Sequence, residues 1–286
     1  MAYNYLTEEA ITHFIKSALH EDVRDGDHSS LAAIPQGKTS SAQLLIKSDG
    51  VLAGMQMAAH ILNFVDKQIR VETFKHDGDA VVFGDIGMKV TGSAISILTA
   101  ERLLLNCLQR MSGIATYTAQ LVKLIAHTNA KLLDTRKTTP NFRIAEKWAV
   151  KIGGGKNHRF GLFDMIMLKD NHNDFAGGIT ESVMATKKYL IKNKLDLRIE
   201  VETRNLVEVK EALSTQAVDV IMLDNMAPAL MKEAIAIIDK RCETEASGGI
   251  TEKTIAPVAE TGVDYISVGA LTHSYKSLDI SLKAIS

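Results

Sequence analysis

The pattern of apolar and polar positions divides the chain into two halves with different rhythms. In the first, to about residue 110, the spacing predicts a helix over Ala10–Leu19 with Thr7 as its N-cap, and another over Met55–Val65. Short apolar runs around these helices predict strands at Ala42–Lys47, Ile69–Phe74 and Gly87–Gly92. This half is expected to be a mixed α+β domain with the second helix against one face of its sheet.

The second half repeats an apolar run and a helix-like stretch roughly every 20 to 35 residues, the length of a βα unit. The predicted strands are Lys131–Asp134, Asp164–Leu168, Leu197–Val201, Val218–Leu223, Lys240–Thr244 and Val263–Val268. The predicted helices are Thr180–Lys194, Leu206–Ser214, Pro228–Asp239 and Thr251–Thr261. Near-continuous apolar strands favour a parallel sheet covered by helices. No Gly-x-Gly-x-x-Gly follows the first strand, so an incomplete α/β barrel of about six strands is preferred to a doubly wound dinucleotide-binding fold.

Polar residues follow every predicted barrel strand, and in such barrels the carboxyl ends of the strands form one rim. The first of these strand ends reads Asp134-Thr135-Arg136-Lys137. Glu200 and Glu202 are two residues apart and therefore share one face of their strand. If that face is the barrel interior, each carboxylate costs several kcal/mol unless a cation or a metal lies near it. The arrangement predicts a charged ligand.

The cations and glycines near these strand ends indicate the kind of ligand. Positive charge comes from Arg136, Lys137, Arg159 and Lys169, with His158 beside Arg159. Arginine forks suit carboxylates and phosphates. Ser247-Gly248-Gly249 and Val268-Gly269-Ala270 follow the last two strands, which is the usual phosphate-binding position in barrels. We therefore expect a phosphorylated, multiply anionic substrate.

Glu202 and Asp224 end neighbouring strands opposite these cations. Two such carboxylates suit Mg²⁺ held partly through water beside a substrate pyrophosphate. The alternative is a pair of salt bridges to Lys137 and Lys169. The two interpretations are compatible, because one can describe the empty site and the other the loaded site.

Composition limits the partners and the compartment. A net charge of −1 gives no general attraction to nucleic acid or to a membrane surface. Cys107 and Cys242 show no metal-type spacing and are predicted to be packed thiols in a reducing compartment. The N-terminus shows no signal-peptide pattern, and no run approaches the roughly 20 apolar residues of a membrane helix. A soluble cytoplasmic protein is expected.

Several motifs, in family order, resemble the quinolinate phosphoribosyltransferases, also called nicotinate-nucleotide pyrophosphorylases (carboxylating). They are Glu101-Arg102, Ser112-Gly113-Ile114-Ala115-Thr116, Asp134-Thr135-Arg136-Lys137-Thr138-Thr139-Pro140, Gly153-Gly154-Gly155-Lys156-Asn157-His158-Arg159, Leu168-Lys169-Asp170-Asn171-His172, Ser247-Gly248-Gly249 and Ser267-Val268-Gly269-Ala270-Leu271-Thr272-His273. The resemblance implies an N-terminal open sandwich domain and an incomplete α/β barrel in an obligate homodimer. We expect the sandwich domain over 1–112, the barrel over 113–273, and a C-terminal helix over 274–286 packed back on the sandwich.

The resemblance also implies a reaction and a set of roles. Quinolinate and phosphoribosyl pyrophosphate (PRPP) would react, with Mg²⁺, to nicotinate mononucleotide, pyrophosphate and CO₂. Arg136, Arg159 and Lys169 would hold the quinolinate carboxylates, with Thr135 and His158 close by. Lys137 would face the pyrophosphate, and Glu202 with Asp224 the ribose hydroxyls and the metal. The glycine loops, Ser247, Gly248 and Gly249 with Val268, Gly269 and Ala270, would hold the 5′-phosphate, and Arg102 would reach into the partner's site.

Two other functions are weighed against this one. A related phosphoribosyltransferase could act on another base such as nicotinate, but a monocarboxylate needs fewer cations than these positions supply. A sensor that binds a phosphate ligand without turnover would not need Lys137, Glu202 and Asp224, which suit chemistry at a leaving group.

Overall fold

The computed structural model describes residues 4–285, and these form two compact units. One unit contains residues 4–119, 137–154 and 270–285, and the other contains 120–136 and 155–269. The first three residues of the predicted sandwich domain and the last residue of the predicted C-terminal helix lie outside the described part. Within residues 4–285, no helix combines the length and apolar character needed to cross a membrane.

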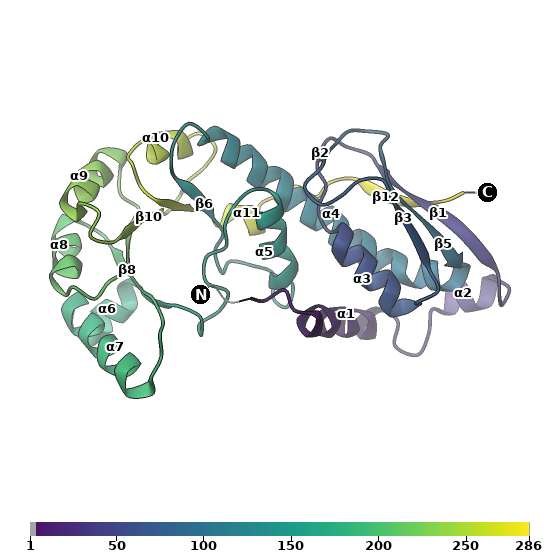
Figure 1. The fold of residues 1–286 in the computed structure, drawn as a ribbon, viewed down its shortest axis with the longest axis horizontal. Helices are drawn as coiled ribbons and strands as arrows, with labels where there is room; N and C mark the ends of the chain where they lie inside the picture. The colour runs from purple at the N-terminus through teal and green to yellow at the C-terminus, as the bar shows by residue number, and fades with distance from the viewer. Residues whose placement is uncertain (1–3, 286) are drawn as a thin grey trace. The chain divides into compact units, whose positions relative to one another are not determined.

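The unit that contains residues 4–119, called the N-terminal unit below, is built on an antiparallel four-stranded sheet in the order β12-β1-β5-β3 (Figure 1). Its strands are β1 (Thr39–Ile46), β3 (Arg70–Thr73), β5 (Ile86–Ser93) and β12 (Ile280–Ile285), and β2 (Gly50–Val51) pairs separately with β4 (Ala80–Val81). Its helices are α1 (Glu8–Asp22), α2 (His28–Ala33), α3 (Met55–Val65), most of α4 (Ala94–Leu124), α5 (Arg143–Ile152) and α11 (Ala270–His273). Thr7 caps α1 by accepting the N–H of Ala10 at 3.2 Å, as the sequence predicts.

The end of the chain is a strand, so the predicted helix over 274–286 is wrong. β12 pairs antiparallel with β1 along its whole length, with Leu282 opposite Leu44. Ile280 and Leu282 are buried, whereas Ser281 between them is partly exposed. This period of two matches a sheet with one covered face, and pairing with β1 supplies the backbone partners.

The second unit is a parallel six-stranded sheet in the order β6-β11-β10-β9-β8-β7, curved with helices outside it (Figure 1). The strands are β6 (Lys131–Leu133), β7 (Ile166–Leu168), β8 (Ile199–Thr203), β9 (Val220–Asp224), β10 (Glu243–Ser247) and β11 (Tyr265–Ser267). The outer helices are α6 (Asp170–Ala176), α7 (Ile179–Asn193), α8 (Leu206–Ser214), α9 (Pro228–Ile238) and α10 (Ile255–Ala259). The sheet has open ends at β6 and β7, so the predicted incomplete barrel of six strands is confirmed.

Three barrel strands, β8, β9 and β10, begin and end later than predicted. β8 continues through Thr203 and β10 through Ser247, so Glu202 and Glu245 lie inside strands instead of following them, and Glu200 lies inside β8 as predicted. Val201 and Ala246, on the alternate positions, have no exposed surface. The glutamates therefore occupy the other face of the sheet, which makes one face of these strands acidic and the other apolar.

Candidate functional site

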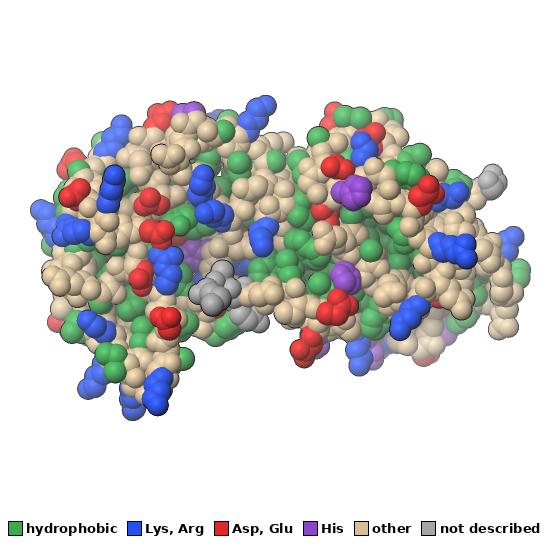
Figure 2. All heavy atoms as spheres, in the orientation of Figure 1, with side chains coloured by type: hydrophobic (Ala, Val, Ile, Leu, Met, Phe, Trp, Pro, Cys, Tyr) green, Lys and Arg blue, Asp and Glu red, His purple; other side chains and the backbone are tan. Residues whose placement is uncertain are grey.

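The carboxyl ends of the barrel strands bring most of the predicted site residues to one rim. Because all six strands are parallel, their ends lie on the same edge of the sheet. In chain order, the groups at or just after these ends are Thr135, Arg136, Lys169, Glu202, Asp224, Ser247, Gly248, Gly249, Val268 and Gly269. Figure 2 shows acidic and basic side chains intermixed on the barrel face in view, consistent with the near-zero net charge.

Arg136 and Arg159 form the positive part of the rim. Burial lowers the pKa of the half-buried Arg159, and the charge of Arg136 lowers it further. Arg159 Nη1 donates to the carbonyl of Met165 at 3.2 Å. Arg136 Nε is buried and has no hydrogen-bond partner among the described residues. Two neighbouring guanidinium groups with a spare buried donor favour an anion with more than one negative group.

Glu202 and Asp224 form the negative part. Burial raises the pKa of Glu202; the Lys169 charge opposes this effect and the Asp224 charge adds to it. Lys169 Nζ lies 3.5 Å from Glu202 Oε2, so one of the two predicted salt bridges is present. Asn225 Nδ2 donates to Asp224 at 2.6 Å. Two interacting carboxylates offer the hard oxygen ligands that Mg²⁺ prefers, so this donor set fits the ion.

His158 lies between two buried carboxylates. Its Nε2 is 2.8 Å from Glu200 Oε2 and 3.3 Å from Glu245 Oε2. Burial lowers the pKa of His158, whereas its hydrogen bonds with these glutamates raise the pKa above its usual range. The backbone N–H of Arg159 acts in the opposite direction, since it donates to Nδ1 at 2.7 Å and only an unprotonated Nδ1 can accept. This contact places the ring proton on Nε2, facing the carboxylates.

His158, Glu200 and Glu245 are close enough to be considered as metal ligands. A ligating histidine, however, binds the metal through one nitrogen and donates a hydrogen bond from the other. Here Nδ1 accepts, so Nε2 carries the proton and has no lone pair to offer. Burial and the nearby Glu245 charge raise the pKa of Glu200 to about 7, which favours a proton in the cluster. The three side chains thus do not fit a metal.

The glycine loop after β10 requires its glycine for a steric reason. Gly248 has φ +98°, and a Cβ there would collide with the side-chain amide of Asn225. The N–H of Asn225 donates to the carbonyl of Ser247 at 2.8 Å, which ties the ends of β9 and β10 together. A Cβ on Gly249 would meet nothing within 4 Å. The loop therefore packs against Asn225 on one side and is open on the other, which leaves room for an anion to approach its backbone.

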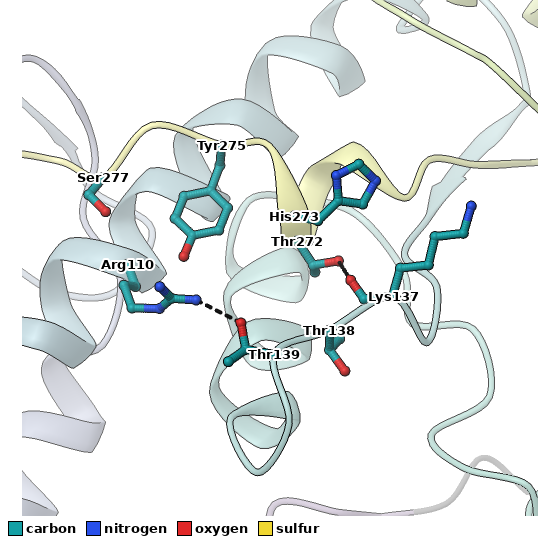
Figure 3. A pocket seen from close by; sticks show the side chains of 8 residues that line it. All are labelled: Arg110, Lys137, Thr138, Thr139, Thr272, His273, Tyr275 and Ser277. Carbon is teal, nitrogen blue, oxygen red and sulfur yellow. Dashed lines mark hydrogen bonds between the residues drawn. The ribbon is translucent and has the colours of Figure 1, made fainter.

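Three predicted residues belong to the N-terminal unit. Lys137 lines a pocket of about 590 Å³, and its carbonyl accepts a hydrogen bond from Thr272 at 2.8 Å (Figure 3). Arg110 donates to Thr139 in the same pocket, whose other lining residues are Thr138, His273, Tyr275 and Ser277. Arg102 is exposed on α4, and Ala270 starts α11. Sequence reasoning missed this pocket, because its residues are distant in sequence and carry no common spacing.

A parallel barrel whose rim gathers guanidinium groups, carboxylates and glycine loops defines a class of enzymes that bind phosphorylated, multiply anionic substrates. Two family models narrow this class. The quinolinate phosphoribosyl transferase N-terminal domain matches residues 27–112, and the C-terminal domain of the same family matches residues 114–283. The chain belongs to the quinolinate phosphoribosyltransferase family, so the resemblance of its motifs is confirmed.

Relatives along the whole chain agree with this assignment. The chloroplastic nicotinate-nucleotide pyrophosphorylase (carboxylating) of Oryza sativa subsp. japonica is 50% identical over 284 residues, covering 94% of this chain and 76% of the rice protein. The probable Bacillus subtilis (strain 168) enzyme of that name is 39% identical over 262 residues, covering 92% and 89%. The solved structure of the Francisella tularensis nicotinate-nucleotide pyrophosphorylase has a TM-score of 0.91 and 38% identity, covering 100% and 99%.

Proposed function

We infer that the chain transfers the phosphoribosyl group of PRPP to quinolinate and releases pyrophosphate and CO₂, giving nicotinate mononucleotide. Within the site, one observation supports quinolinate as the substrate. The charge of Arg136 lowers the pKa of Arg159, which places the two guanidinium groups near each other, and Arg136 Nε is buried without a hydrogen-bond partner among the described residues. Quinolinate carries two adjacent carboxylates, which would accept from both guanidinium groups and supply the missing acceptor.

The resemblance of the motifs to those of the family implies the remaining roles, and the charges of these residues are compatible with them. Lys169 would contact a quinolinate carboxylate, with Thr135 and His158 nearby. The loops Ser247-Gly248-Gly249 and Val268-Gly269-Ala270 would hold the 5′-phosphate through backbone N–H groups. Lys137 would neutralise the departing pyrophosphate. Glu202 and Asp224 would face the ribose hydroxyls and hold Mg²⁺, which supplies further charge neutralisation on the pyrophosphate when bound.

The chemistry uses these groups in sequence. As pyrophosphate leaves, positive charge develops at ribose C1, and the carboxylates of Glu202 and Asp224 stabilise it. The pyridine nitrogen of quinolinate, oriented by Arg136 and Arg159, then bonds to C1. The quaternised ring accepts the electron pair of the adjacent carboxylate C–C bond, so CO₂ departs and a proton takes its place. Because the ring itself is the electron acceptor, no separate decarboxylation cofactor is required.

The test is a mass-spectrometric assay of the purified protein with PRPP, Mg²⁺ and either quinolinate or nicotinate. We expect nicotinate mononucleotide and CO₂ in the quinolinate reaction alone. Product from nicotinate alone would contradict dicarboxylate binding and assign the chain to another base. Binding of PRPP without product from either base would indicate a binding protein rather than an enzyme.

We also propose a homodimer in which Arg102 completes the site of a second subunit; the exposure of Arg102 on α4 supports this role. Mixing unfolded Arg102→Ala and Arg136→Ala chains and refolding them together tests it. Each heterodimer would contain one intact site, so about a quarter of wild-type activity should return. No recovery above the two parent variants would contradict the shared site.

The two free cysteines fit a reducing compartment, which supports a cytoplasmic location.

A further inference from the structure

Two buried carboxylates have no part in the reaction as derived above. Glu200 and Glu245 have at most 1% of their surface exposed, and each has one oxygen, Oε1, without a hydrogen-bond partner among the described residues. Burying a carboxylate in this way costs several kcal/mol. A hydrophobic pair of similar size would fill the same space without this cost. The two side chains therefore call for a role other than filling the core.

Their position indicates that role. Glu200 lies on β8 and Glu245 on β10, and β9 runs between these strands. His158 Nε2 contacts both, at 2.8 Å and 3.3 Å, so two carboxylates from the strands on either side of β9 converge on one atom of the ring. The two carboxylates fix the ring from two separate strands, which leaves it little freedom to rotate.

The ring in turn holds the main chain of the next residue. Nδ1 of His158 accepts the N–H of Arg159 at 2.7 Å. On the other side, Asp134, fully buried after β6, accepts the N–H of His158 at 2.9 Å and the amide of Asn157 at 2.6 Å. The segment that carries Arg159 is thus anchored at the rim by Asp134 and in the barrel interior by the two glutamates.

We propose that Glu245 is a positioning residue for the base: it holds the His158 ring in place so that Arg159 meets the base carboxylate in a fixed orientation. This inference rests on the proposed function, because it assigns Arg159 to carboxylate binding. Glu245 is the informative partner of His158, since Glu200 shares β8 with Glu202 and a change there would also disturb the carboxylates assigned to Mg²⁺.

Two conservative variants separate position from charge. Glu245→Gln keeps the length of the side chain and an oxygen that can accept from Nε2, but removes the charge. Glu245→Asp keeps the charge but withdraws it from the ring by one methylene. Glu243→Gln is the matched control, because Glu243 lies two residues earlier on the same strand face and pairs with Arg198 and Tyr265. Steady-state kinetics with quinolinate and with PRPP, and thermal unfolding, are measured for all three.

We expect Glu245→Asp to raise the KM for quinolinate about tenfold, and Glu245→Gln to raise it less than about threefold. The KM for PRPP should stay near the wild-type value in both, and Glu243→Gln should leave the quinolinate KM unchanged. Equal quinolinate KM values in all variants, or a larger increase in Glu245→Gln than in Glu245→Asp, would overturn the positioning role while the proposed function stands. A wild-type protein that does not turn over quinolinate would overturn the proposed function and this inference with it.

Discussion

Arg110 Nη2 lies 3.0 Å from Oε1 of Glu146, a carboxylate with no exposed surface. The guanidinium carbon is also within 5.2 Å of the ring centre of Phe142 and 5.4 Å of that of Tyr275. Glu146 accepts the N–H of Thr139 at 3.0 Å as well. This pair joins α4 to α5 and to the segment that starts with Lys137, so the stability of the N-terminal unit depends on it.

Arg110→Met should therefore be strongly destabilising, since it leaves the Glu146 charge buried without its cation. We expect a loss of about 3 kcal/mol in the free energy of unfolding, measured by urea titration. The double variant Arg110→Met/Glu146→Gln removes both charges and should regain most of that loss. Equal stabilities of the single variant and the wild type would show that water already screens the pair.

Arg136→Ala and Arg159→Ala should each abolish efficient use of quinolinate while the fold stays intact. Removing a guanidinium that binds a carboxylate costs about 2–4 kcal/mol, which corresponds to roughly a 30- to 1000-fold loss in kcat/KM. Steady-state assays and circular dichroism measure the two effects. Arg198→Ala is the control, because Arg198 is exposed, precedes β8 at the end of the strands opposite the rim, and pairs with Glu243. Near-wild-type turnover by either variant would refute the carboxylate assignment.

Gly113→Ala should destabilise the protein although the residue lies inside α4. In an unconstrained helix the change from glycine to alanine stabilises by about 1 kcal/mol. Here the added Cβ would collide with the carbonyl of Lys276 and lie 2.9 Å from the Cα of Ser277. We expect a lower melting temperature by calorimetry and a loss of about 2 kcal/mol or more. An increase in melting temperature would mean that the segment 276–277 moves aside at little cost.

Asp27 should make the free energy of unfolding of the N-terminal unit depend on pH in the acidic range. Hydrogen bonds from the hydroxyl and the N–H of Ser30, at 2.5 and 3.1 Å, lower the pKa of Asp27 as it caps α2. A lowered folded-state pKa adds stability above the unfolded value near 3.9, and this stability is lost as the pH falls through the folded value. Asp27→Ala should cost about 1 kcal/mol at pH 7 and much less near pH 2. A pH-independent difference in urea unfolding would exclude this linkage.

Local signals account for the parts of the fold that the sequence predicts well. The bounds of α3 and α8 match their predictions, because apolar spacing and the Asn205 cap of α8 act within a few residues. β12 was missed, since the residues that make it a strand lie in β1 near the other end of the chain. A short segment such as Ile280–Ile285 carries no local information that outweighs its pairing partner.

In the site, too, features set by local sequence could be predicted and others could not. The rim positions of Arg136, Lys169, Glu202 and the glycine loops could be predicted, because each lies at or near the carboxyl end of a strand and the parallel topology brings these ends together. The start of β10 could not, since the apolar pattern predicts a strand over Lys240–Thr244, whereas β10 spans Glu243–Ser247 and contains Glu243 and Glu245. These two glutamates belong to the polar interior of the barrel. The sequence indicates this by their spacing of two residues, the same spacing as that of Glu200 and Glu202, which places both members of a pair on one face of a strand.

The pairing of β12 with β1 has a consequence for synthesis of the protein. The sheet of the N-terminal unit takes its outer strand from residues 280–285, so it cannot be completed before those residues have left the ribosome. Until then β1 has an unpaired edge and exposes Leu44, which is fully buried in the finished structure. A nascent chain stalled before residue 280 should therefore recruit chaperones at β1, and release of the last strand should end that association.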